Sequence, residues 1–204
     1  MTKNNRHIYP TRCGQVAVVP IGNLAELEHN ATAEELQSVE GITALSSRVV
    51  RLAWRALLRE MLSPTTAEVS YLPSGKPQIR NSQYQHISVS HSRDYVAVAL
   101  SQDPCGVDVE RIDRNFEHVK SRYMTVAESQ LSADRRWAAV VWCAKEALYK
   151  YAGREGLDFL RDIVILSVQQ QGKSWSLVAE MLGTENVELR GECLGENHIL
   201  VFTM

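Results

Sequence analysis

The sequence predicts an α+β protein of two pseudo-symmetric lobes, each a small, mainly antiparallel sheet packed on a long helix. Two long helical patterns, near residues 44–62 and 137–151, alternate with short strand patterns bounded by glycine and proline. The order also repeats, because helix 48–62, strand 67–72 and Gly75-Lys76 are echoed by helix 136–151, strand 163–168 and Gly172-Lys173. The 204 residues suffice for two such units, which we place at 1–103 and 104–204.

The composition is that of an ordinary soluble globular protein, with 45% hydrophobic and 23% charged residues. A net charge of −2 argues against a general nucleic-acid binder, which is usually basic. No apolar run approaches the length of a membrane span, and the run from Val16 to Ile21 is too short for a secretory signal. The cysteines are far apart and form no CxxC pair, which is typical of free thiols in a reducing compartment. We therefore expect a cytoplasmic protein.

The first half contains one early strand pattern and two helical ones. Residues 15–19 read as a strand closed by Pro20. Residues 31–40 read as a short helix, because Thr32 and Glu35 have the spacing of a capping box and Gly41 breaks the pattern. Residues 44–62 form a convincing amphipathic helix, which Pro64 ends.

A stripe of arginines follows the polar side of helix 44–62. Because they recur every three or four residues, these side chains share one face of the helix. They are Arg48, Arg51, Arg55 and Arg59. The stripe is either a solvated face or a surface that meets an anion.

The remaining elements are mostly strands. Strand patterns cover residues 67–72, 86–90, 95–100, 163–168, 175–179 and 198–202, with a strong turn signal at 73–77. Residues 111–134 are irregular and charged, apart from a short helix expected around 116–123. The second long helix covers 137–151 and ends at Gly153.

The segment Cys105–Glu110 draws attention because two acids alternate with two valines. In a strand, Val107 and Val109 face one side and Asp108 and Glu110 the other. Two carboxylates about 7 Å apart repel each other unless a metal ion or a basic side chain lies between them. Gly106 would allow another backbone or a ligand to come close. The simpler alternative is a solvated face of an edge strand.

The second long helix offers a third acid. Trp142, Glu146 and Lys150 lie near one face of it, and Glu146 with Lys150 is also an ordinary helix-stabilising pair. The functional interpretation makes Glu146 a ligand together with the two strand acids. Three carboxylates without histidine or thiol suit a hard cation, Mg²⁺ first, and Mg²⁺ sites commonly bind phosphate esters. Lys150 would then contact a phosphate.

One histidine follows a strand between two serines. His91 in Ser90-His91-Ser92 is either structural or, with Lys76, a phosphate contact at the mouth of the same cleft.

Together these motifs resemble the 4'-phosphopantetheinyl transferase superfamily, in its longer two-lobed type that activates peptide, polyketide and fatty-acid synthases. The resemblance extends from about Arg48 to Lys150, and the acid-strand and helix motifs are specific in combination. The motifs are Gly75-Lys76-Pro77, Ser88-Val89-Ser90-His91-Ser92, Gly106-Val107-Asp108-Val109-Glu110, and Trp142 with Lys145-Glu146-Ala147 and Lys150.

The resemblance implies transfer of phosphopantetheine from coenzyme A to a serine of an apo acyl or peptidyl carrier protein, releasing 3',5'-ADP. It implies a coenzyme A cleft between the lobes, with Mg²⁺ on Asp108, Glu110 and Glu146. Glu146 would act as the base, directly or through a water on the metal, and Lys150 would neutralise charge. The residues implied at coenzyme A are Lys76, His91 with its neighbour Ser90, Lys150, and Arg48 or Arg51.

Two departures from the family's pattern stand out. The family's Phe-rich segment ending in glutamate reads Arg122-Tyr123-Met124 here, followed by Glu128. Basic residues expected upstream of the first helix, near the adenosine 3'-phosphate, are replaced by acids. These are Glu34, Glu35 and Glu40.

Two other function classes compete with the transferase. A non-catalytic module that docks carrier domains would not need three acids, and a Mg²⁺-dependent pyrophosphohydrolase would act without a carrier. Because the chain is slightly acidic, carrier docking would need a local patch, for which residues 111–136 offer a basic cluster or merely a solvated loop. Its members are Arg111, Arg114, Lys120, Arg122, Arg135 and Arg136. One chain can form its own cleft, so we expect a monomer.

Overall fold

The computed structural model describes residues 6–73, 75–183 and 185–204; the first five residues of the predicted N-terminal lobe and Ser74 of the predicted turn lie outside this description. The first half contains β1 (His7–Pro10), β2 (Gly14–Pro20), α1 (Leu24–Asn30), α2 (Ala33–Gln37), α3 (Leu45–Leu62), β3 (Glu68–Tyr71), β4 (Pro77–Arg80), β5 (His86–His91) and β6 (Tyr95–Ser101). The second contains β7 (Val107–Arg111), α4 (Phe116–Val119), a 3-10 turn (Lys120–Arg122), α5 (Val126–Ser129), α6 (Trp137–Ala152), β8 (Ile163–Gln171), β9 (Ser174–Met181), β10 (Glu185–Leu194) and β11 (His198–Thr203).

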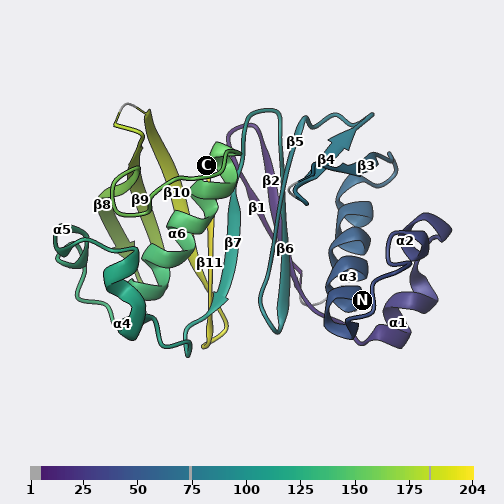
Figure 1. The fold of residues 1–204 in the computed structure, drawn as a ribbon, viewed down its shortest axis with the longest axis horizontal. Helices are drawn as coiled ribbons and strands as arrows, with labels where there is room; N and C mark the ends of the chain where they lie inside the picture. Colours follow the sequence, from purple (N-terminus) through teal and green to yellow (C-terminus); the bar gives the residue numbers. More distant parts are fainter. Residues whose placement is uncertain (1–5, 74, 184) are drawn as a thin grey trace.

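The strands form two main antiparallel sheets, which confirms the predicted α+β class. One sheet has the order β1-β2-β6-β5 and the other β7-β11-β10-β9-β8, while β3 and β4 form a separate hairpin. The two sheets lie side by side in the middle of the molecule, with α3 outside one and α6 outside the other (Figure 1).

The predicted internal repeat is visible in the topology. In each half a strand (β2 or β7) leads to the long helix, then to a hairpin (β3-β4 or β8-β9), and finally to two strands (β5-β6 or β10-β11). The last strand pairs with the first in both halves, as β6 with β2 and β11 with β7. The halves differ because β9 pairs with β10, whereas the β3-β4 hairpin is not joined to β5 by a strand ladder.

Several short elements were not predicted. The predicted helix 31–40 is only five residues long, with the capping box of Thr32 and Glu35 present, and α1 precedes it. The strands β1, β4 and β10 and the one-turn helix α5 were also missed. The sequence shows little sign of α1, because the helix buries a single residue, Leu27, and so has weak hydrophobic periodicity.

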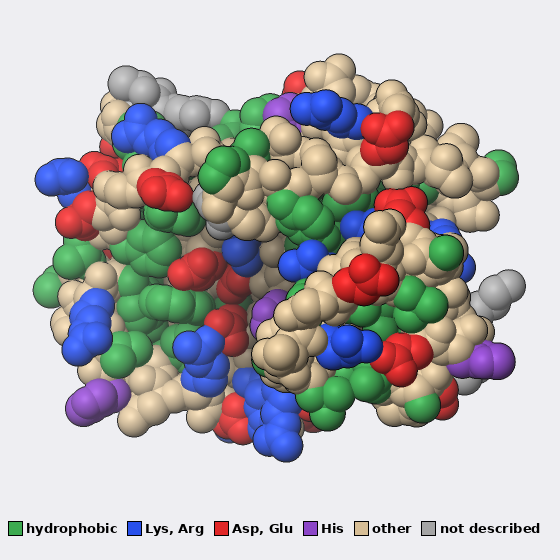
Figure 2. Space-filling view, turned by 45° about the vertical axis from the view of Figure 1, so that its right-hand side comes forward, with side chains coloured by type: hydrophobic (Ala, Val, Ile, Leu, Met, Phe, Trp, Pro, Cys, Tyr) green, Lys and Arg blue, Asp and Glu red, His purple; other side chains and the backbone are tan. Residues whose placement is uncertain are grey.

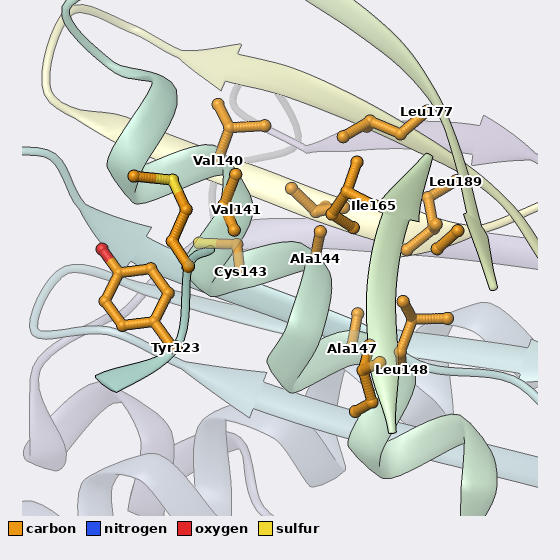
Figure 3. Close-up of a cluster of buried hydrophobic side chains, with 14 of the residues drawn as sticks. Tyr123, Val140, Val141, Cys143, Ala144, Ala147, Leu148, Ile165, Leu177 and Leu189 are labelled. Carbon is orange, nitrogen blue, oxygen red and sulfur yellow. The ribbon is translucent and has the colours of Figure 1, made fainter. Parts of the chain in front are cut away.

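The second half is built around α6. The helix is buried on nearly all sides, since one face packs on the sheet and the other meets the segment that contains α4 and α5. Figure 3 shows side chains of α6, among them Ala144 and Leu148, beside Ile165, Leu177 and Leu189 of the sheet.

A third cluster of buried side chains joins the two sheets to each other. Val107 and Val109 of β7 belong to it, as predicted from their alternation with the acids. Val16 and Ala97 contribute from the other sheet. Gly106, which precedes β7, allows the chain to lie against α6, because a Cβ there would lie 1.9 Å from the carbonyl oxygen of Ala147. The close approach predicted at this glycine is therefore made by a helix backbone.

Candidate active site

The site lies where the edge strand β7 of one sheet meets the edge strand β5 of the other. The outward N–H groups of Val107 and Val109 lack a neighbouring strand there. They donate instead to side chains of β5: Val107 N to Ser88 Oγ at 3.2 Å, and Val109 N to Ser90 Oγ at 3.3 Å. Two serines spaced by one residue therefore fix the acid-bearing strand against the first half of the molecule.

Asp108 is buried and carries two strong contacts on one oxygen. Its Oδ1 accepts a hydrogen bond from Ser90 Oγ at 2.7 Å and from Lys150 Nζ at 2.7 Å. Lys150 Nζ also donates to the carbonyl of Val107 at 3.0 Å. The second oxygen, Asp108 Oδ2, is buried and has no hydrogen-bond partner among the described residues, and such an atom is costly unless something polar or positive occupies its side.

Glu110 is paired with a base from the turn that follows β7. Arg114 donates to Glu110 Oε1, and this contact raises the pKa of the guanidinium. The same guanidinium lies over the rings of Phe116 and Trp142, at 5.5 and 5.9 Å from their centroids. From the sequence, either a metal ion or a basic side chain could relieve the repulsion between the two strand acids. The structure shows a basic side chain at each of them.

Glu146 approaches the same acids from α6. Burial raises the pKa of its half-buried carboxyl, and the charge of Asp108 raises it further, as does that of Glu110. Lys150 and Arg114 act in the opposite direction. The three carboxylates predicted from the sequence are therefore close enough to interact electrostatically, although they come from two different elements.

The oxygen atoms of these three carboxylates are suitable ligands for a hard divalent cation, but in this structure they are not positioned to bind one together. Within the described ranges, no three His, Cys, Asp or Glu side chains are placed so that they could share one ion. However, the unpartnered oxygen of Asp108 and the raised pKa of Glu146 are both features that a nearby cation would relieve. The magnesium site stays a prediction.

Lys76 ties the first half to the end of α6. Its Nζ donates to the carbonyl oxygen of Lys150 at 3.0 Å, in the last turn of the helix, where a cation is favoured by the helix dipole. Gly153 ends the helix with a positive φ of 64°, and a Cβ at that position would lie 2.9 Å from Lys76 Nζ. Glycine therefore leaves room for the lysine.

One cavity lies at the seam between the halves, and a second adjoins it in the first half. The larger, of about 610 Å³, is lined by Lys76 and Ser88 from the first half and by Tyr149, Lys150 and Arg154 from the second. The smaller, of about 360 Å³, shares Pro77 and Val89 with it and is otherwise lined by residues of the first half. These include Ser46, Ser47, Arg51, Tyr71 and His91. On the face shown in Figure 2, basic, acidic and histidine side chains gather around the middle, where the surface is hollowed.

The structure brings four of the predicted site residues to these two cavities, whereas Asp108, Glu110 and Glu146 line neither. Lys76 and Lys150 line the larger cavity, and Arg51 and His91 line the smaller one. Ser90 is buried against Asp108 and does not line either cavity.

The arginine stripe of α3 is divided between two roles. Three of its members are neutralised by acids of α1 and α2, and Arg55 is buried as well. The pairs are Arg48 with Glu28 at 2.9 Å, Arg55 with Glu34 at 2.7 Å, and Arg59 with Glu35 at 2.9 Å. Two of the glutamates that depart from the family's pattern thus serve the packing of α2 on α3. Arg48 is held by Glu28 rather than placed in the smaller cavity.

Two of the motif residues support the fold of the second half. Lys145 and Glu128 form a fully buried ion pair at 2.7 Å. Lys145 also donates to the carbonyl of Phe159, and Glu128 accepts from the backbone N–H groups of Thr125 and Ile165. The acid that survives from the family's Phe-rich segment therefore anchors α5 to α6 and β8.

The predicted basic cluster at residues 111–136 is largely paired internally. Arg111 binds Asp94 and Asp113, Arg114 binds Glu110, Lys120 binds Glu117 and Arg136 binds Asp134. These pairs remove most of the net positive charge that an acidic partner would meet.

Some contacts and residues of the site were not predicted, since Arg114 was expected only as a member of the basic cluster at residues 111–136. Arg114 follows Glu110 by four residues, but the segment is a turn, so no helical spacing pointed to the pair. Tyr71, Ser46 and Ser47 come to the smaller cavity from two separate elements. No local pattern could have joined them.

Comparisons with known proteins agree with the predicted resemblance. The model of the 4'-phosphopantetheinyl transferase superfamily matches residues 104–200. The chain is 29% identical over 135 residues to the 4'-phosphopantetheinyl transferase psf-1 of Bacillus pumilus, covering 62% of this chain and 57% of that protein. It is 27% identical over 137 residues to a 4'-phosphopantetheinyl transferase of Bacillus subtilis, covering 59% and 61%.

A further relative aligns over more of the sequence. The 4'-phosphopantetheinyl transferase AcpT of Salmonella typhimurium is 28% identical over 155 residues, which is 72% of this chain and 75% of that protein. By comparison, the chain aligns with little more than half the length of psf-1. The resemblance to the superfamily is confirmed. Among the described residues, no helix has the length and apolar character needed to cross a membrane.

Proposed function

We propose that this chain is a 4'-phosphopantetheinyl transferase that moves 4'-phosphopantetheine from coenzyme A to a serine of an apo acyl or peptidyl carrier protein. The observation that carries the proposal is the partly buried contact of Lys150 with Asp108 beside Glu146, at the seam lined by Lys76. The four motifs and the family match supply the chemistry. The holo carrier protein and 3',5'-ADP would be the products.

The reaction asks for little covalent chemistry from the protein. The oxygen of the carrier serine attacks the phosphorus that bears pantetheine, the bond from that phosphorus to the bridging oxygen breaks, and 3',5'-ADP leaves with the bond's electrons. The protein must mainly position the pyrophosphate and neutralise its charge. Lys76 and Lys150 are suited to this, because both amines lie at the larger cavity.

Glu146 is our candidate for the base that takes the serine proton, directly or through a water molecule. A carboxylate with an ordinary pKa is a weak base near neutral pH, and burial beside Asp108 raises the pKa of Glu146 toward the useful range. Its position on α6 brings it close to the strand acids, one helical turn before Lys150, which lines the larger cavity.

The proposal includes Mg²⁺ on Asp108, Glu110 and Glu146. Carboxylates are the ligands that Mg²⁺ prefers, and a bound cation would neutralise charge on the pyrophosphate. The unpartnered Asp108 Oδ2 supports this assignment.

We further propose Arg51 and His91 for the nucleotide end of coenzyme A, since they line the cavity that adjoins the pyrophosphate end. Ser90 would act indirectly, by orienting Asp108. The division of the chain at residues 103 and 104 belongs to the same proposal, because it places the larger cavity between two lobes.

The cellular setting is also proposed. The four cysteines are free, which suits a reducing compartment, and we propose the cytoplasm. A single chain contributes both sides of the seam, which favours a monomer. The slightly acidic chain gives no reason to expect nucleic acid as a partner.

The nucleotide products test this function. The protein is incubated with coenzyme A and Mg²⁺, with and without an apo carrier protein, and the nucleotides are separated by chromatography. We expect 3',5'-ADP only when the carrier is present. Formation of 3',5'-ADP without a carrier would favour the pyrophosphohydrolase, and binding of the carrier without any product would favour the docking module.

A further inference from the structure

Arg51 differs from the other arginines of α3 in the kind of partner it has. Its guanidinium lies over the ring of Tyr71, with Cζ at 4.5 Å from the ring centroid. The other three arginines of the stripe are bound to carboxylates. Among the ion pairs of residues 6–73, 75–183 and 185–204, none involves Arg51.

The two kinds of partner have different consequences for charge. A carboxylate holds a guanidinium but cancels its charge. The face of an aromatic ring attracts the cation through its quadrupole and adds no net charge. Arg51 is therefore held in place while its full positive charge stays available to a ligand.

The surroundings of Arg51 favour an anion. It lines the smaller cavity together with His91, Ser46 and Ser47, and these serines lie in the first turn of α3. That turn contains no acidic residue, and its N-cap residue Ala44 offers no side-chain hydrogen bond. No aspartate or glutamate lines this cavity among the described residues. The polar side chains that line the cavity are hydrogen-bond donors or cations, and apolar residues such as Val50 and Val89 form the rest of its wall.

Tyr71 is itself well supported. Its ring lies edge-on to Trp54, with centroids 6.5 Å apart, and Trp54 is buried in the core of the first half. The hydroxyl lies 3.5 Å from Nη1 of Arg55, which is buried and paired with Glu34. The ring is thus fixed by its own neighbours and can serve as a platform for Arg51.

We propose that Tyr71 is a positioning residue that holds Arg51, charged and unpaired, for the 3'-phosphate of coenzyme A. The inference rests on the proposed function. Coenzyme A carries a pyrophosphate, where the bond breaks, and a separate phosphate on the ribose. Lys76 and Lys150 lie at the larger cavity and suit the pyrophosphate. The adjoining smaller cavity with Arg51 is left for the ribose phosphate.

The proposal explains how the chain can recognise this phosphate although acids replace the expected upstream bases. Glu34 and Glu35 neutralise their own arginines and leave Arg51 alone. The recognition of the phosphate then depends on one guanidinium and on the ring beneath it.

The test compares affinities for coenzyme A and 3'-dephospho-coenzyme A by isothermal titration calorimetry. We expect the wild-type protein to prefer coenzyme A. Tyr71→Leu should weaken coenzyme A binding by about three- to tenfold, the effect of losing one cation–π contact, and leave 3'-dephospho-coenzyme A nearly unchanged. Tyr71→Phe keeps the ring and should keep the preference. Arg51→Gln should lose the preference for coenzyme A. Adding Tyr71→Leu to Arg51→Gln should weaken coenzyme A binding no further.

The controls separate positioning from folding. Tyr71→Gln serves as a second ring-less variant if Tyr71→Leu is poorly folded, and Arg59→Gln, a paired arginine of the same helix, should keep the preference. In steady-state assays Tyr71→Leu should raise KM for coenzyme A with kcat little changed. The proposal would be overturned if Tyr71→Leu weakened the binding of coenzyme A and of 3'-dephospho-coenzyme A equally. It would also be overturned if Tyr71→Phe lost as much affinity for coenzyme A as Tyr71→Leu. A wild-type protein that binds neither ligand would refute the proposed function itself, and this inference with it.

Discussion

Lys150 on α6 and Asp108 on β7 are joined by a 2.7 Å contact between Nζ and Oδ1. Lys76 of the first half donates to the backbone of Lys150, and Ser90 of the first half donates to Asp108. A chain of four polar residues therefore starts and ends in the first half and passes through the second. The two halves are locked together at the point where the proposed reaction takes place.

Loss of the Lys150 amine should slow catalysis strongly. Lys150→Met removes the cation beside Asp108 and at the larger cavity, and we expect kcat for carrier modification to fall by about 100-fold or more. Lys150→Arg, which keeps the charge with a different shape, should retain more activity. Steady-state kinetics check this, and a loss of less than tenfold for Lys150→Met would show that the amine is not needed.

At neutral pH, the ionised Glu146 side chain should make the folded protein less stable than an uncharged side chain at this position would. Its pKa is raised above the ordinary value of 4.5, so the folded state holds the proton more tightly than the unfolded state. The ionised carboxylate therefore costs folding free energy above this raised pKa, and the cost disappears as the pH falls through and below 4.5.

Glu146→Gln should accordingly raise Tm near about pH 7.5 in the presence of a chelator, and the gain should shrink in acid. Thermal melts over a pH series check this, with Glu40→Gln at an exposed position as the control. Adding Mg²⁺ should reduce the gain, because a cation would stabilise the carboxylate. A Glu146→Gln protein that is less stable than wild type at every pH would contradict the account.

The sequence predicted the long elements and the acid strand because each has a strong local pattern. Helices 44–62 and 137–151 have helical periodicity, and Val107 and Val109 alternate with the acids as a half-buried strand requires. The strand β10 was missed because charged residues are spread along it and Gly191 interrupts it. The glycine is explained only by the fold, since its backbone lies against Trp175 of β9.

Gly106 should not tolerate even a methyl group. In Gly106→Ala the new Cβ would lie 1.9 Å from the backbone oxygen of Ala147, so β7 and α6 would have to separate. We expect a loss of several kcal/mol, or about 10 °C or more in Tm, as for overpacked cores. Gly22→Ala is the matched control, because its nearest neighbours lie at 3.8 Å. Equal melting temperatures for the two variants would refute this role of Gly106.

The buried pair of Lys145 and Glu128 should be essential for stability. Lys145→Met leaves the carboxylate of Glu128 buried without its counter-charge, which typically costs about 3–5 kcal/mol. Urea denaturation measures this as a lower midpoint with an unchanged slope. The exposed pair of Lys173 and Glu196 offers a control, since Lys173→Met should change stability by less than about 1 kcal/mol. A similarly small change for Lys145→Met would show that the pair is not a structural anchor.

The partners of the site residues could not be predicted from the sequence. Periodicity places the arginines of α3 on one face, but only the tertiary structure shows that Glu28, Glu34 and Glu35 neutralise three of them. Spacing likewise suggested a structural pair of Glu146 with Lys150, whereas Lys150 reaches across to Asp108. Contacts between elements far apart in the chain leave no local pattern.

The central claim is that this seam transfers phosphopantetheine, and the intact mass of an apo carrier protein tests it most directly. With coenzyme A and Mg²⁺, the wild-type protein should add the mass of one phosphopantetheine group to the carrier. Asp108→Asn, which keeps the shape but removes the charge that Lys150 contacts, should add none on the same time scale. No mass gain on any of several acyl and peptidyl carriers, or an equal gain with Asp108→Asn, would contradict the account.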